Sequence, residues 1–231
     1  MTPTGVASDR PTRVRWFPIL GLVFIATLIN YLDRAVFSIA RPLFTNELGI
    51  SALVAGTMGS AFSWSYAFAQ IPGGAVLDRF GTRMVYFVSL VTWSVVTMFQ
   101  GLVSTVGAFI GLRVALGVCE APCFPANSRV LNSWFPQQER ARATSIYSVG
   151  LSAGLAFLTV PLFWIAEHYT WRGLFVAAGG IGVLFGVVWY AVCEYVIKMW
   201  PIIITALASI VIYPARASDY EAFPRMIAGH I

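Results

Sequence analysis

Six stretches of this sequence are long and apolar enough to predict helices that cross a lipid bilayer. A bilayer-spanning helix needs about 20 largely apolar residues. The stretches lie at residues 16–42, 51–77, 84–104, 106–131, 143–166 and 173–196. Only helices and closed barrels satisfy every backbone hydrogen bond inside lipid, so helical stretches of this length predict an all-α membrane protein. Because the links are short, consecutive helices are expected to run antiparallel in one bundle.

The composition excludes an ordinary soluble domain. Of the 231 residues, 11% are charged and 58% are hydrophobic, whereas a soluble domain carries about 25% charged residues. The three cysteines lie within predicted helices and have no nearby histidine, so neither a disulfide framework nor a metal site is expected. No sequence motif of a hydrolase or metalloenzyme is present. We therefore predict neither an enzyme nor a cofactor.

The basic residues predict the orientation of the helices. Those near the two ends and on the same side of the bundle are Arg10, Arg13, Arg15, Arg79, Arg83, Arg129, Arg140, Arg142 and Lys198. The other side has only Arg41 and Arg172 near its loops. By the positive-inside rule, both termini are expected in the cytoplasm, which predicts a multi-pass protein of the cytoplasmic (inner) membrane. The net charge of +5 is thus a topology signal, and no nucleic-acid partner is expected.

The chain divides into three parts by its pattern. Residues 1–15 form a cytoplasmic N-terminal segment, and residues 16–192 form the six-helix bundle. From about residue 193 the pattern changes, because the apolar run 202–213 is too short to cross a bilayer and has Pro201 and Pro214 at its two ends. Residues 193–231 are therefore expected to be an interfacial or disordered tail, or the product of a frameshift.

Four ionisable residues, Asp33, Arg34, Arg113 and Glu120, lie well inside the predicted helices. Each costs about 2.5–3.5 kcal/mol at a helix centre, so such residues usually face a partner or a cavity. Residues at steps of three and four, most of them polar, also form stripes on three helices: Thr27, Tyr31, Arg34, Ser38 and Arg41; Ser63, Tyr66, Gln70 and Gly74; and Arg113, Gly117, Glu120, Phe124 and Asn127. Three polar faces favour a water-filled cavity. The alternative is that buried ion pairs only set the packing of the helices.

The depth of these charges predicts which of them meet. Asp33 and Arg113 lie at about the same distance from the outer boundary, roughly 10 Å at a rise of 1.5 Å per residue, so they could meet if their helices adjoin. Glu120 lies two turns deeper. Arginine binds carboxylates through two parallel hydrogen bonds, and an acidic residue that gains and loses an arginine partner changes its proton affinity. The pattern favours a site that binds a carboxylate and moves protons.

Small residues predict where helices approach closely. Gly150 and Gly154, and again Gly182 and Gly186, have the GxxxG spacing that is typical of contacts between membrane helices.

Residues 73–83 resemble the G-x-x-x-D-R-x-G-x-R loop of the major facilitator superfamily. Gly74, Asp78, Arg79, Gly81 and Arg83 are in register with that pattern and fall between the second and third predicted helices. In that family the loop is a conformational latch, in which the aspartate caps a helix and pairs with an arginine. An ordinary charged turn is the alternative.

Further segments resemble the anion:cation symporter family within that superfamily. They are residues 29–34, 111–122, 124–127, 133–136 and 139–141, and the likeness covers about residues 16–192. The resemblance implies a symporter that takes up a small organic anion, including sugar acids, with protons by alternating access. It implies proton coupling at Asp33 and Glu120, and a pairing of Arg113 with Asp33 that tunes its proton affinity. It implies substrate binding by Arg34, Tyr31, Tyr66 and Asn127.

The sequence departs from this family at two points. Leu151 stands where sugar-acid transporters of this kind can carry a glutamine, which favours a less polar carboxylate over a polyhydroxylated one. The family also has two six-helix halves with the cavity between them, and the resemblance covers an N-terminal half only. Three interpretations are open: a truncated transporter half, an inert fragment, and a half-size subunit that needs a second copy.

Overall fold

The computed structural model describes the backbone of residues 15–212, and the side chains of residues 16–193 except 150, 151 and 153–155. Some of the predictions fall outside the described parts. They concern residues 1–14 and 213–231, the side chain of Leu151 and the Gly150–Gly154 pair. The chain forms two compact units, Met1–Trp189 and Tyr190–Ile231. The helices and contacts that follow belong to the first unit unless a range says otherwise.

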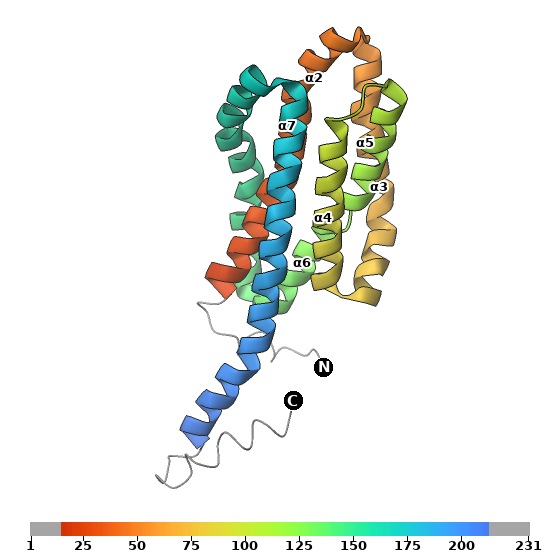
Figure 1. Ribbon diagram of the computed structural model, residues 1–231. Coiled ribbons are helices and arrows are strands. Elements are labelled where there is room, and N and C mark those ends of the chain that lie inside the picture. The colour runs from red at the N-terminus through yellow and green to blue at the C-terminus, as the bar shows by residue number, and fades with distance from the viewer. Residues whose placement is uncertain (1–14, 213–231) are drawn as a thin grey trace. The chain divides into compact units, whose positions relative to one another are not determined.

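The described chain is helical almost throughout (Figure 1). A short π-helical turn, η1, leads into the first long helix, and five further α-helices follow. The elements are η1 Arg15–Ile19, α2 Leu20–Leu48, α3 Ala52–Phe80, α4 Thr82–Gln100, α5 Val106–Glu120, α6 Cys123–Trp134 and α7 Gln137–Ile212. At Thr170 of α7 the backbone has non-helical angles (φ 64°, ψ 171°), which divide α7 into two helical parts. Five of the six predicted stretches therefore coincide with one helix or one part of α7, and the fourth covers α5 and α6.

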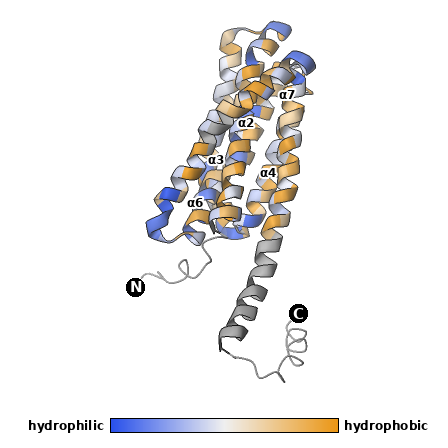
Figure 2. Cartoon of the chain, turned by 90° about the vertical axis from the view of Figure 1, so that its left-hand side faces the viewer, coloured by the Kyte–Doolittle hydropathy of each residue, from blue (hydrophilic) through white to orange (hydrophobic). Residues whose placement is uncertain are grey.

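Four described segments are long and apolar enough to cross a membrane: Trp16–Leu48, Thr82–Gln100, Val106–Trp134 and Ala156–Cys193. Helix α3 does not meet this criterion, because serines, Gln70 and Asp78 interrupt its apolar residues. Figure 2 shows mainly hydrophobic residues along the middle of the helices and hydrophilic residues at their ends. This distribution fits a bilayer-spanning bundle. The orientation of the termini stays a prediction.

The link between α3 and α4 is shorter than the sequence predicts. Helix α3 continues through Phe80, and the Gly81 N–H donates a hydrogen bond of 3.0 Å to the Leu77 carbonyl. Gly81 alone separates the two helices, with a φ of 79° that glycine adopts more easily than other residues. Asp78 and Arg79 thus lie in the last turn of α3, and Arg83 lies in the first turn of α4.

The predicted fourth stretch is broken into α5 and α6 at Ala121 and Pro122. Proline has no N–H to donate and its ring crowds the preceding turn, so it interrupts or bends a helix. Gly73 of α3 lies against this break, and a Cβ atom on Gly73 would lie 3.3 Å from the Pro122 Cα atom. The break therefore packs directly against α3.

Glycines bring other helices together. A Cβ atom on Gly117 of α5 would lie 2.7 Å from the Phe62 carbonyl oxygen and 2.8 Å from the Tyr66 nitrogen, both on α3. In the second part of α7, a Cβ atom on Gly182 would lie 3.0 Å from the Ser94 Cβ atom of α4, and one on Gly186 would lie 2.8 Å from the Leu90 side chain. The close contact predicted for Gly182 and Gly186 is confirmed, and their neighbour is α4.

Candidate functional site

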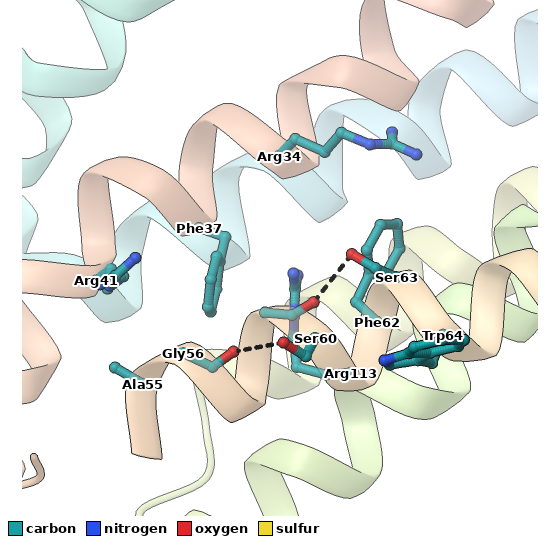
Figure 3. Close-up of a pocket in the computed structure, with 11 residues that line it drawn as sticks. Arg34, Phe37, Arg41, Ala55, Gly56, Ser60, Phe62, Ser63, Trp64 and Arg113 are labelled. Atoms are coloured by element: carbon teal, nitrogen blue, oxygen red, sulfur yellow. Dashed lines mark hydrogen bonds between the residues drawn. The ribbon is translucent and has the colours of Figure 1, made fainter. Parts of the chain in front are cut away.

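A pocket of about 440 Å³ lies between α2 and α3, with α5 behind them. Figure 3 shows Arg34, Phe37 and Arg41 of α2 on one side and residues of α3 on the other, with the side chain of Arg113 of α5 reaching between them. The residues that line it are Arg34, Phe37, Arg41, Ala55, Gly56, Gly59, Ser60, Phe62, Ser63, Trp64 and Arg113. Three arginines and no acidic residue line this pocket.

Arg34 is held by α2 itself and by α5. Its Nη1 atom donates to the Asn30 carbonyl oxygen at 2.8 Å, to Asn30 Oδ1 at 2.7 Å and to Glu120 Oε1 at 3.1 Å. The bonds to Asn30 follow from the i, i+4 spacing of the two residues on one helical face. Within the described chain, the Nε and Nη2 atoms of Arg34 donate to no residue, so one edge of the guanidinium is free to bind an anion.

Glu120 is the fully buried partner of Arg34. None of its surface is exposed, and 25% of the Arg34 side chain is exposed. The second oxygen of Glu120, Oε2, is buried without a hydrogen-bond partner among the described residues. A buried carboxylate is stable only when it is paired or takes up a proton. Glu120 therefore depends on Arg34 for its ionised state.

Arg113 is buried among aromatic rings. It is 4% exposed, and its Cζ atom lies 3.9 Å from the centre of the Phe37 ring and 4.7 Å from that of the Phe62 ring. Its Nε atom donates to the Met58 carbonyl oxygen at 3.3 Å. The two Nη groups donate to no residue of the described chain. Cation–π contacts stabilise the charge and leave these donors available to the pocket.

The depths of the four charged residues inside the membrane suggested that Asp33 and Arg113 could meet, but the structure shows a different ion pair. The described chain has an ion pair between Arg34 and Glu120, and none within 4.0 Å between Arg113 and Asp33. Asp33 and Arg34 are consecutive on α2, so their side chains point about 100° apart around a helix of 3.6 residues per turn. Only Arg34 meets Glu120. The proposed pairing of Arg113 with Asp33 stays a prediction.

Asp33 is buried next to Arg34 in the sequence of α2 and does not line the pocket. It is 5% exposed, and Thr97 of α4 lies beside its carboxylate. Asp33 Oδ2 and Thr97 Oγ1 are both buried without a hydrogen-bond partner among the described residues. An unpaired buried carboxylate oxygen is costly, and none of the described residues offers Asp33 an ion pair or a hydrogen bond at this oxygen.

The remaining predicted substrate residues divide into two groups. The rings of Tyr31 and Tyr66 lie under Arg34, with their centres 4.7 Å and 5.4 Å from its Cζ atom. Asn127 of α6 is 2% exposed and donates a 3.3 Å hydrogen bond to the Thr27 hydroxyl of α2. None of these three residues lines the pocket. The two tyrosines contact Arg34, which does line it, whereas Asn127 joins α2 to α6.

The predicted latch contains an ion pair. Asp78 Oδ1 accepts a 2.8 Å hydrogen bond from Arg129 Nη1 of α6, so the aspartate does meet an arginine. Arg129 entered the sequence argument only as a topology signal. Arg79 lies over the Phe80 ring at 5.5 Å. No neighbour other than its own helix would come within 4 Å of a Cβ atom on Gly74. The role of this segment in changing conformation stays a prediction.

A second group of contacts was missed by sequence reasoning. Glu47, at the end of α2, accepts a 2.6 Å hydrogen bond from Trp171 Nε1 and forms a 3.3 Å ion pair with Arg172. Arg172 also donates to the carbonyl oxygens of Gly101 and Val103, which follow α4. We call Glu47, Trp171 and Arg172 the end clasp. Glu47 is more than 120 residues away in sequence from Trp171 and Arg172, and no local pattern indicates such a contact.

Comparison with known proteins shows which protein family this chain resembles. A sequence model of the Major Facilitator Superfamily matches residues 23–212. A D-galactonate transporter of Escherichia coli O6:H1 is 43% identical over 189 residues, which are 82% of this chain and 44% of that protein. A probable galactarate/D-glucarate transporter of Bacillus subtilis is 36% identical over 195 residues, which are 82% and 42% of the two chains. The chain thus spans less than half the length of these relatives.

Solved structures share the fold. A bacterial homologue of the human lysosomal transporter Spinster, in an inward-facing and occupied conformation, has a TM-score of 0.65 and 23% identity over 79% of this chain and 44% of its own. A peptide transporter has a TM-score of 0.71 and 16% identity over 92% of this chain and 50% of its own. At these identities the likeness is one of fold.

Proposed function

Because the chain belongs to the major facilitator superfamily, we propose that it carries the N-terminal six-helix half of a transporter that moves organic anions together with protons. The chain is a multi-pass membrane protein. We place it in the cytoplasmic (inner) membrane, where an imposed proton gradient can drive uptake. The relatives are transporters of sugar acids by name, and a carboxylate of this kind is the substrate class that we propose here.

The observation that carries this proposal is the Arg34–Glu120 ion pair beside a pocket lined by arginines. A substrate carboxylate and the Glu120 carboxylate would compete for the same guanidinium. When Glu120 takes up a proton its charge is lost, and Arg34 becomes free to bind the substrate. Binding of the anion and binding of the proton then favour each other. This is the coupling that a symporter needs.

Asp33 provides a second proton site in this proposal. It is buried and does not line the pocket, so it can gain or lose a proton without touching the substrate. Alternating access requires that both acids are neutralised before the substrate-loaded helices move, because an unpaired charge is costly inside a membrane.

The test is uptake by the purified 231-residue chain in liposomes. With an inward proton gradient, labelled D-galactonate is expected to accumulate above its outside concentration. Asp33→Asn and Glu120→Gln are each expected to abolish accumulation, because neither amide carries a proton. Glu167→Gln is the matched control, since Glu167 is exposed and its side chain forms no hydrogen bond or ion pair with a described residue.

Two results would contradict the proposal. Accumulation that is the same in Asp33→Asn and Glu120→Gln as in the unmodified chain would exclude proton coupling through these acids. Absence of uptake in the unmodified chain would favour an inert half.

A further outcome concerns the number of copies. Uptake that rises with the square of the number of protein molecules per liposome would favour a half-size subunit that works as a pair.

A further inference from the structure

Asn30 is a buried residue of α2 to which the proposed function gives no role. It is 2% exposed and lies one turn before Arg34 on the same helix. Its backbone carbonyl oxygen and its Oδ1 atom accept hydrogen bonds of 2.8 Å and 2.7 Å from the same Arg34 nitrogen, Nη1. Asn30 therefore fixes the position of the Arg34 guanidinium from within α2.

The Nη1 atom of Arg34 has more acceptors than hydrogens. It carries two hydrogens, and three oxygen atoms accept from it: the two of Asn30, and Glu120 Oε1 at 3.1 Å. The two contacts with Asn30 are the shorter ones. Loss of the Glu120 contact therefore leaves one acceptor for each hydrogen, and Nη1 stays fully bonded.

The Asn30 side chain also lies beside the Glu120 carboxyl group. Asn30 Nδ2 and Glu120 Oε2 are both buried without a hydrogen-bond partner among the described residues. An amide N–H donates to a carboxyl oxygen whether the acid is ionised or protonated. Asn30 can therefore serve a neutral Glu120 as well as a charged one.

Other titratable groups surround Glu120 as well, and the test has to separate them from Asn30. They come from α2, from α3, from α5 itself and from α6: Asp33 and Arg34; Tyr66; Arg113; and Cys123.

An arginine that loses its carboxylate partner gains freedom of rotation unless another group holds it. The arginine side chain has a large rotamer entropy, and ordering such a side chain when a ligand binds lowers the affinity. A residue that keeps Arg34 ordered after Glu120 is neutralised removes this cost. The two hydrogen bonds from Asn30 have this effect.

We propose that Asn30 is a positioning residue, which holds the Arg34 guanidinium at the pocket when Glu120 takes up a proton. Proton uptake then leaves a preformed anion site instead of a mobile side chain. This inference rests on the proposed function, because it assumes that a proton on Glu120 releases Arg34 for the anion. It adds the residue through which that release becomes binding affinity.

The test measures D-galactonate binding to the purified chain in lipid nanodiscs by calorimetry across a pH titration. The unmodified chain is expected to bind more tightly at the acidic plateau, where Glu120 is protonated, than at the alkaline plateau. Asn30→Leu keeps a side chain of similar size but has no amide. Its affinity is expected to fall about 10-fold at the acidic plateau. At the alkaline plateau it should be unchanged, because Glu120 still holds Arg34 there.

A second background removes the titration of Glu120. Glu120→Gln is expected to bind D-galactonate at every pH about as tightly as the unmodified chain does at its acidic plateau. Adding Asn30→Leu to Glu120→Gln should then lower the affinity about 10-fold at every pH. Asn30→Ala, in both backgrounds, is expected to give the same results and keeps the test decisive if the leucine variant does not fold.

Gln100→Leu is the matched control. Gln100 of α4 is also a fully buried amide, and neither of its amide atoms has a hydrogen-bond partner among the described residues. Its replacement by leucine removes a buried amide that does not bond to Arg34. Both plateaus are expected to stay unchanged.

Each outcome decides between the two proposals. If Asn30→Leu leaves the acidic plateau unchanged, or lowers both plateaus by the same factor, the positioning role is wrong, and the pH dependence of the unmodified chain still supports the proposed function. If the unmodified chain binds equally at both plateaus, or if its pH dependence persists in Glu120→Gln, coupling through Glu120 is wrong and the positioning role is wrong with it. If the unmodified chain binds no D-galactonate, both proposals are wrong.

Discussion

At the scale of single residues, the Arg34 guanidinium determines the chemistry of the site. Its Nη1 atom donates hydrogen bonds to Asn30 and Glu120, whereas its Nε and Nη2 atoms have no partner among the described residues. Aromatic rings of Tyr31, Phe62 and Tyr66 surround it. These contacts keep the charge at a defined position without consuming all of its donors. A side chain that binds a ligand needs a defined position and unused hydrogen-bond donors. An arginine whose donors are all paired cannot donate to a ligand.

The Arg34–Glu120 pair is expected to show strong coupling in a double-mutant cycle. Removing one partner of a buried pair leaves the other uncompensated and costs about 3–5 kcal/mol. Arg34→Ala and Glu120→Ala should each lower the free energy of unfolding by about this amount, measured by denaturant titration in detergent micelles. The double variant should lose much less than the sum of the two. Additive losses would show that the two side chains do not interact.

At the scale of helices, glycines determine which polar faces meet. Gly117 lets α5 approach the α3 backbone near Phe62 and Tyr66, and Glu120 follows Gly117 by one turn. Helices in membranes pack through such small residues, since lipid supplies no hydrophobic force between them. The position of Arg113 and Glu120 beside the pocket therefore depends on a residue that carries no side chain.

Replacement of Gly117 is expected to disturb this contact. A branched side chain in Gly117→Val would overlap the α3 backbone, and overpacking of this kind costs about 1–3 kcal/mol. A lower melting temperature in detergent is expected, together with weaker carboxylate binding. Gly111→Ala on the same helix is the control, because a Cβ atom there would meet no neighbour within 4 Å other than its own helix. Equal melting temperatures for the two variants would contradict the packing argument.

At the scale of the whole six-helix unit, long-range contacts join its two ends. The end clasp joins α2, α7 and the link after α4, and the Asp78–Arg129 pair joins α3 to α6 at the opposite end. The pocket lies on the helices between these contacts. In the proposed transporter such a half would move largely as one body, so contacts that hold its helix ends together would also preserve the site.

The end clasp is expected to contribute to the stability of this unit. Glu47→Ala removes the acceptor of Trp171 Nε1 and the ion-pair partner of Arg172. Each hydrogen bond to a charged group contributes about 1.5–3 kcal/mol when buried, and less here because Glu47 is 49% exposed. The melting temperature should therefore fall by a few degrees. Glu167→Ala, an exposed glutamate of α7 without a described side-chain contact, should leave it unchanged.

If both glutamate variants melt at the same temperature, the clasp contributes nothing measurable. Intrinsic tryptophan fluorescence offers a second readout, because Trp171 loses its carboxylate partner in Glu47→Ala alone.

The sequence by itself determined the six helices, the charges inside the membrane and the face of each helix on which they lie. These follow from apolar length and from steps of three and four residues, which are local properties. The i, i+4 contact of Asn30 with Arg34 was open to the same reasoning. Family motifs added the latch segment and the expected substrate class. The predicted end of α3 was less accurate. The apolar pattern ends at residue 77, whereas the helix continues through Phe80 and ends at Gly81.

Only the tertiary structure decided which charge meets which. Spacing along a helix gives depth and direction, but the rotation of one helix against another depends on close packing at residues such as Gly117. That packing turned Arg34, and not Asp33, toward Glu120, and it placed Arg41 of α2 and Arg113 of α5 in the lining of one pocket. The end clasp joins residues more than 120 positions apart for the same reason: such contacts depend on how whole helices pack, which no local pattern records.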